Sequence, residues 1–201
     1  MTAARDEGAP AADLEMLERA TSLVRSAFQS DGRIEVMGFV ATRAGATPAM
    51  RMVTTPGLRT VLERRNFADA LRHLSIRSAS PCSAVAYDAR IMEGAASKGR
   101  AVGKRGAAGK SAKAGEAVII AVESDAGRTE LRLSVTRQGN GRIDVDADQE
   151  PVFTQRCDAG ARPDDELRDF HVPTMDRINP SVVAWAAQMD RHADRMLDGR
   201  P

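Results

Sequence analysis

A glycine-rich run, GKRGAAGKSAKAG at residues 103–115, contains the Gly-Lys-Ser triplet that ends many phosphate-binding loops. Such a loop needs another glycine five residues before its last one, and Lys104 occupies that position. The run also leads into AVIIAVES at 117–124, which predicts a strand, whereas a phosphate-binding loop opens a helix whose backbone amides hold the anion. The pattern therefore predicts no nucleotide-binding site and no bound cofactor.

Basic side chains are concentrated around this run. Of the 22 residues from 94 to 115, 13 are Gly or Ala and six are Lys or Arg, with no acidic residue among them. This composition predicts a flexible basic surface loop between two strands. The candidates for contact with nucleic acid, through backbone phosphates bound within 98–113, are Lys98, Arg100, Lys104, Arg105, Lys110 and Lys113. No aromatic residue lies among them to stack on bases.

Three carboxylates stand near the ends of predicted strands. Asp88 and Glu93 flank the end of the strand that begins at Cys82, and Glu123 lies at the end of the next strand. If these strands are neighbours, a pair of carboxylates at one sheet end would supply the acid and the base of a hydrolase. The alternative is that they are charged residues at points where strands leave the core.

The acidic run DVDADQE, residues 144–150, begins with the alternating carboxylates of a calcium-binding loop. The sixth position of that loop requires Gly and is Gln149 here, and the twelfth requires Glu and is Gln155. In a strand, the same alternation places the carboxylates on one solvent face, where their charge opposes pairing with another chain. The run therefore predicts an acidic edge strand and no metal site.

The histidines and cysteines lack the spacing of metal ligands. His73, His171 and His192 lie among polar residues on or near predicted helices, which predicts surface or half-buried side chains. Cys82 and Cys157 are far apart in the sequence and are predicted to be reduced thiols. We expect no metal at these side chains, and a catalytic triad assembled from distant parts of the chain is left open.

The overall composition is that of an ordinary globular protein. Lys and Arg number 29 against 28 Asp and Glu, so the net charge of +1 gives no general attraction for nucleic acid or anionic membranes. No stretch approaches the ~18 consecutive apolar residues of a membrane span, and the first residues lack the pattern of a secretory signal. We therefore expect a cytoplasmic protein that does not bind membranes, with one substantial core in its 201 residues.

Apolar residues at helical intervals predict three amphipathic helices, at 13–31, 60–77 and 180–198. Asp13 is the expected N-cap of the first helix, and Gly32 is its stop. A capping box between Thr60 and Glu63 opens the second helix. Trp185 belongs to the apolar stripe of the third helix and is expected in the core or at an interface.

Strands are predicted at 34–39, 49–55, 82–92, 117–124 and 129–137, with a weaker one at 142–147. The turn DAGR at 125–128 joins the clearest hairpin, and the proline-containing stretch 149–178 shows no period. The order α-β-β-α-β-β-β-α predicts an α+β fold in which helices flank an antiparallel sheet of about five strands. A disordered leader at 1–12 would precede a single domain at 13–198, with the basic loop at 94–115.

Residues 60–146 resemble an uncharacterised group of small bacterial α+β proteins of unknown function. The likeness lies in PCSAVAYDARIMEG, a strand with an aromatic and an acidic residue near its end, and in the strand and Gly-Arg turn of EAVIIAVESDAGRTELRLSVTRQGNGRI. These are hydrophobic and turn positions, so the resemblance implies a fold and no activity. The group has a short connection where this chain has its long basic one.

The first functional hypothesis is a non-enzymatic α+β module that acts through contact with another protein or with its own copy. It rests on two amphipathic terminal helices that are able to dock elsewhere, together with the lack of a residue pattern that specifies a reaction. One alternative is association with nucleic acid through 98–113. The other is a hydrolase that uses Asp88, Glu93 and Glu123 at one end of the sheet.

Overall fold

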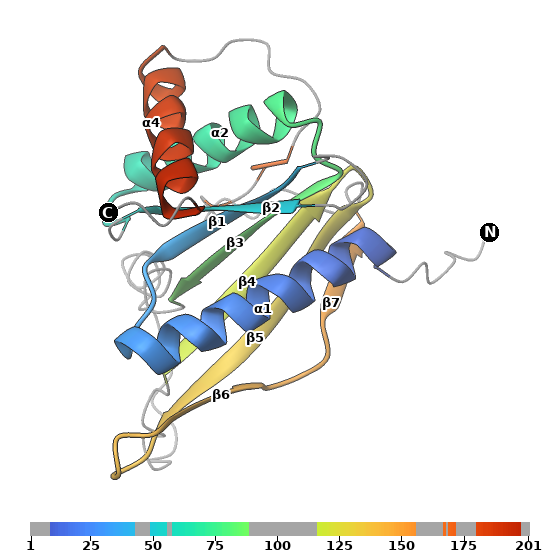
Figure 1. Cartoon of the computed structure of the whole chain (residues 1–201). Coiled ribbons are helices and arrows are strands. Elements are labelled where there is room, and N and C mark those ends of the chain that lie inside the picture. Colours follow the sequence, from blue (N-terminus) through green and yellow to red (C-terminus); the bar gives the residue numbers. More distant parts are fainter. Residues whose placement is uncertain are drawn as a thin grey trace, which may run out of the picture.

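The computed structural model describes residues 9–42, 49–55, 58–88, 116–155, 167, 169–171 and 180–197 (Figure 1). The helices and strands in these ranges are α1 (Ala11–Asp31), β1 (Val36–Thr42), β2 (Ala49–Thr55), α2 (Val61–Arg77), β3 (Cys82–Asp88), β4 (Glu116–Ser124), β5 (Gly127–Arg137), β6 (Ile143–Ala147), β7 (Val152–Gln155) and α4 (Pro180–Leu197). The predicted α+β class is confirmed, and so is the order of the three helices among the strands.

The seven strands form one antiparallel sheet in the order β2-β1-β3-β4-β5-β6, rather than the expected five or so. The additional strand β7 pairs with the first half of β5, beyond the part that pairs with β6. It lies in the stretch 149–178, where no strand was expected. Its four residues are too few for an alternating pattern to stand out, so only pairing with β5 defines it.

The sheet is covered on both faces, by α1 on one and by α2 and α4 on the other (Figure 1). Because successive side chains of a strand point to opposite faces, β3 and β4 contribute to two cores. Ala84 and Ile120 pack beneath α1, whereas Val85 and Ala121 pack beneath α2 and α4. Burial on both faces explains why these two strands have nearly continuous apolar sequences.

The second helix starts where its capping box was predicted. Thr60 Oγ1 accepts a hydrogen bond from the Glu63 backbone N at 3.1 Å, and Glu63 Oε2 accepts one from the Thr60 backbone N at 2.8 Å. Gly38 of β1 allows α2 to lie close to the sheet, because a Cβ at that position would overlap the side chain of Leu71. Trp185 of α4 is partly buried against the same core.

The first helix begins at Ala11, and the expected N-cap at Asp13 is wrong. Pro10 precedes the helix, its carbonyl accepts from the backbone N of both Asp13 and Leu14, and no side chain caps the start. Asp13 instead lies inside the first turn, fully buried, where its Oδ2 accepts a hydrogen bond from Ser124 Oγ at 2.9 Å. The stop is confirmed, because Gly32 has a φ of 68° and donates to the Phe28 carbonyl.

Candidate functional site

The sheet separates Asp88 and Glu123, two of the three carboxylates of the hydrolase alternative. Strands β3 and β4 are antiparallel neighbours in a register that places Ser83 beside Glu123 and Asp88 beside Val118. Asp88 and Glu123 therefore lie at opposite ends of the two strands, five residues or roughly 17 Å apart along them. The hypothesis that these two carboxylates meet is wrong, because consecutive antiparallel strands have their C-terminal residues at opposite ends of the pair. Glu93 lies outside the described residues.

Glu123 is instead the centre of a buried polar cluster, formed by Ser75, Ser83, Glu123, Arg128 and His171. Its Oε1 lies 2.8 Å from Arg128 Nη1, and its carboxylate also accepts from the backbone N of Asp169 and of His171 at 3.1 and 3.2 Å. Burial raises the pKa of Glu123, and the charge of Arg128 opposes that change. The carboxylate thus fastens the segment around 169–171 to the end of the β4–β5 hairpin.

The hairpin itself brings Glu123 and Arg128 together. The two residues are directly opposite in the β4–β5 register, on either side of a turn made by Asp125 and Ala126. The sequence-based turn extended over 125–128 and placed Arg128 outside the strand. A hairpin with a two-residue loop, which is the most common length, places Glu123 opposite Arg128, so assuming such a loop would have predicted this cross-strand pair.

His171 is a buried member of this cluster, so its prediction as a surface or half-buried side chain is wrong. Its Nδ1 lies 2.8 Å from Ser75 Oγ and 3.2 Å from Ser83 Oγ. A serine beside a histidine resembles a nucleophile with its base, but Ser83 has no exposed area, and the Glu123 bond is made by the backbone N of His171. The cluster therefore serves to hold α2, β3 and the segment around 171 together.

Cys82 is a poor nucleophile. The side chain is buried beneath α1, where Sγ donates to the Ala12 carbonyl at 3.6 Å. Burial raises the thiol pKa to about 12, with further contributions from the charges of Asp13 and Glu15. The reactive thiolate is therefore scarce at neutral pH. Cys157 lies outside the described residues.

Arginine side chains form ion pairs with acidic side chains in and next to β6. Asp144 accepts from Arg142 Nε at 2.8 Å, and Asp148, just after the strand, lies 3.3 Å from Arg132 Nε. Within the described part of the chain, no three His, Cys, Asp or Glu side chains are grouped closely enough to hold a metal ion. Asp144 and Asp148 thus form ion pairs with exposed arginines on the strand surface.

The nucleic-acid candidates Lys98, Arg100, Lys104, Arg105, Lys110 and Lys113 all lie outside the described residues. The strand expected after the glycine-rich run is confirmed, because β4 begins at Glu116. A phosphate-binding loop would lead into a helix at this point. The run therefore lacks the element that a phosphate-binding loop requires.

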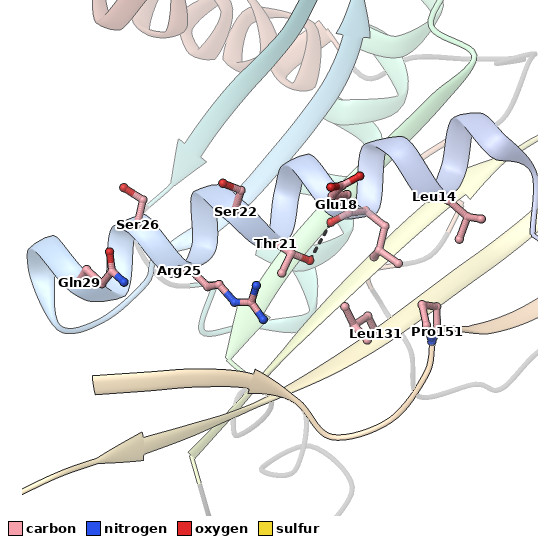
Figure 2. A pocket seen from close by; sticks show the side chains of 10 residues that line it. Leu14, Glu18, Thr21, Ser22, Arg25, Ser26, Gln29, Leu131 and Pro151 are labelled. Carbon is pink, nitrogen blue, oxygen red and sulfur yellow. Dashed lines mark hydrogen bonds between the residues drawn. The ribbon is translucent and has the colours of Figure 1, made fainter. Parts of the chain in front are cut away.

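A groove with a volume of about 690 Å³ runs along α1 (Figure 2). Eight α1 residues from Leu14 to Gln29 line it, recurring with each helical turn on one face, and Leu131 of β5 and Pro151 of the β6–β7 connection lie opposite. The groove forms because α1 packs more extensively on β3 and β4 than on β5 and β6. Sequence periodicity identified the buried side of α1 but had no means of locating its second wall.

The two ends of this α1 groove differ in chemistry. Leu14, Leu17, Leu131 and Pro151 make one end apolar, and Leu14 is 44% exposed. The other end is polar and includes Arg25, whose Nε donates to the Val145 carbonyl of β6 at 2.9 Å. Figure 2 shows Arg25 reaching from α1 toward the strands, at a distance from Leu14.

Comparison of the chain with protein-family models, with curated proteins and with solved structures found no match. The resemblance of residues 60–146 to a bacterial group therefore stays a prediction. Among the described helices, none is long and apolar enough to cross a membrane.

Proposed function

We propose that this chain is a non-enzymatic α+β module that acts through protein–protein contact, with the α1 groove as its contact surface. The observation that carries the proposal is the groove itself, which has an apolar floor at one end and polar side chains along the rest. A partly exposed leucine at such a place is a contact side chain, since apolar patches rimmed by polar residues mark interaction sites.

The chemistry of the groove supports binding rather than catalysis. Glu18 is the only carboxylate among its lining residues, and neither histidine nor cysteine lines it. Catalysis by a pair of carboxylates, or by a nucleophile beside a histidine base, would need side chains that the lining residues do not include. Ser83 and His171, the described pair that most resembles such a site, are buried elsewhere.

The dimensions of the groove favour a segment of extended chain as its occupant. The lining face of α1 runs from Leu14 to Gln29, and the 15 residue steps between them correspond to about 22 Å of helix. An extended segment of about seven residues covers the same length at ~3.3 Å per residue. A partner peptide would lie parallel to α1, between the helix and the β6–β7 connection.

Selection from a displayed library of random nine-residue peptides tests this function. Ser22 and Leu23 are adjacent on α1, but only Ser22 lines the groove. We expect selected peptides to bind wild type and Leu23→Trp alike, and to lose binding to Ser22→Trp, whose indole fills the groove. Peptides that bind Ser22→Trp as well as wild type, or a selection that enriches no binder, would overturn the proposal.

A further inference from the structure

Arg25 is held in a fixed position at the polar end of the α1 groove. Its Nε donates to the Val145 carbonyl at 2.9 Å, which ties the side chain of the helix to the backbone of β6. This bond occupies one donor of the guanidinium and fixes the direction of the planar group. The Nη donors make no hydrogen bond to any described residue, so they are available to an occupant of the groove.

No described carboxylate neutralises Arg25. Glu18 lies in the same groove, seven residues before it, which places the two about 10 Å apart along the helix axis. Asp144 and Asp146 of β6 flank Val145, but alternate side chains of a strand point to opposite faces, and Asp144 is paired with Arg142. Arg25 is thus a positive charge without an ion-pair partner in the described part of the chain.

Neutral hydrogen-bonding groups surround this charge. Ser22 and Ser26 lie within one helical turn of Arg25, Gln29 lies one turn beyond it, and all three line the groove. A guanidinium beside hydroxyl and amide donors is a site for a carboxylate, because Arg binds carboxylates with two parallel hydrogen bonds. The apolar end, 11 residues away at Leu14, lies about 16 Å along the helix.

We propose that the occupant of the α1 groove is an extended acidic peptide segment of a partner protein, whose carboxylate binds Arg25 and whose apolar side chain packs on Leu14, Leu17 and Leu131. This inference rests on the proposed function. The 16 Å separation sets the apolar and the acidic residue of the segment about five positions apart. Glu18 lies between the two contact points and repels a second acidic side chain there.

The charge pattern also distinguishes this occupant from a nucleic acid. A nucleic-acid strand presents phosphates at regular intervals and requires a row of cations along its path. The α1 groove has one arginine and one glutamate. A single carboxylate at one end of a peptide matches that distribution, and a chain of phosphates does not.

Two synthetic nine-residue peptides test the inference. Both have Leu at position 2 and small polar residues elsewhere, and position 7 is Glu in one and Gln in the other. We expect the Glu peptide to bind wild type about tenfold more tightly than the Gln peptide, as a charge-assisted hydrogen-bonded pair predicts. Arg25→Gln should remove that difference, whereas Leu14→Ser should weaken both peptides equally. Raising NaCl to 0.5 M should reduce the Glu preference, because salt screens an exposed pair.

The outcomes separate the two proposals. If peptides that depend on the groove bind equally with Glu or Gln, the acidic-segment inference fails while the groove remains a contact surface. If Ser22→Trp changes the binding of no peptide, the proposed function fails as well. An oligonucleotide whose binding Arg25→Gln abolishes would overturn the inference by assigning the arginine to phosphate. Thermal melts of each variant, matched to wild type, check that lost binding does not reflect unfolding.

Discussion

Asp13 is a buried carboxylate whose charge opposes folding at neutral pH. Its side chain has no exposed area, Oδ2 accepts one hydrogen bond from Ser124 at 2.9 Å, and Oδ1 has no hydrogen-bond partner among the described residues. Burial raises its pKa above the usual value of 3.8, and the bond from Ser124 partly opposes this rise. The folded chain therefore binds a proton at Asp13 more tightly than the unfolded chain does.

The sign of the pH dependence follows from that direction. A carboxyl with a raised folded pKa makes the protein less stable as the pH rises from the unfolded pKa through the folded one. Its cost is absent well below 3.8 and grows as the pH rises above that value. The variant Asp13→Asn keeps the shape and the oxygen that accepts from Ser124, and it has no proton to lose in this range.

We expect Asp13→Asn to raise the free energy of unfolding by about 1 kcal/mol at pH 7. An unsatisfied buried neutral group costs about 1–3 kcal/mol, and a charged group costs more. Loss of the favourable charge in the first turn of α1 takes back about 0.3–1 kcal/mol. Urea denaturation of both proteins from pH 4 to pH 8 measures the difference, which should shrink toward the acidic end.

Glu15→Gln provides the matched control, because Glu15 is an exposed carboxylate in the same helix, paired with Arg19. Its effect should stay within about 0.5 kcal/mol across the same pH range. The reasoning would be refuted if Asp13→Asn lowered the free energy of unfolding, and by the same amount at every pH. That result would mean that the ionised form of Asp13 is satisfied in the folded protein.

Three further predictions concern the buried polar cluster, the contact of α2 with β1, and the basic run. Arg128→Met should lower the free energy of unfolding by about 3 kcal/mol at pH 7, because Glu123 is left buried without its cation. Adding Glu123→Gln to Arg128→Met should restore part of the lost stability. If urea denaturation shows that the losses of the two single variants simply add in the double variant, this coupling is contradicted. Gly38→Ala should cost about 1–3 kcal/mol, since its Cβ overlaps Leu71, and an unchanged thermal midpoint would contradict the close packing. Replacing 91–115 by Asn-Gly should preserve the fold and change the free energy of unfolding by less than about 2 kcal/mol, because β3 and β4 are already antiparallel neighbours. Unfolding of this variant would contradict the prediction. If the intact protein binds nucleic acid with a slope of log affinity against log salt near −5, and the replacement abolishes that binding, the nucleic-acid alternative is favoured.

The sequence by itself determined those elements whose signals lie within a few residues of one another. The Thr60–Glu63 capping box depends only on one helical turn, and the stop at Gly32 depends on a single left-handed residue. The β4–β5 hairpin follows from two strand-forming runs on either side of a short turn. The apolar runs of β3 and β4 also indicated strands, and their lack of alternation is explained by burial on both faces of the sheet.

The tertiary structure alone decided where these elements lie relative to one another, and with it every candidate site. Asp88 and Glu123 are separated because the antiparallel register places them at opposite ends of the paired strands β3 and β4. Asp13 became a buried partner of Ser124 rather than a cap, and His171 became buried against Ser75 and Ser83, through contacts more than 85 residues apart in the chain. The α1 groove depends both on where α1 packs on the sheet and on the path of the β6–β7 connection, which is distant in the sequence. Local spacing has no information on such contacts, because they are set by strand order and by the packing of helices on the sheet.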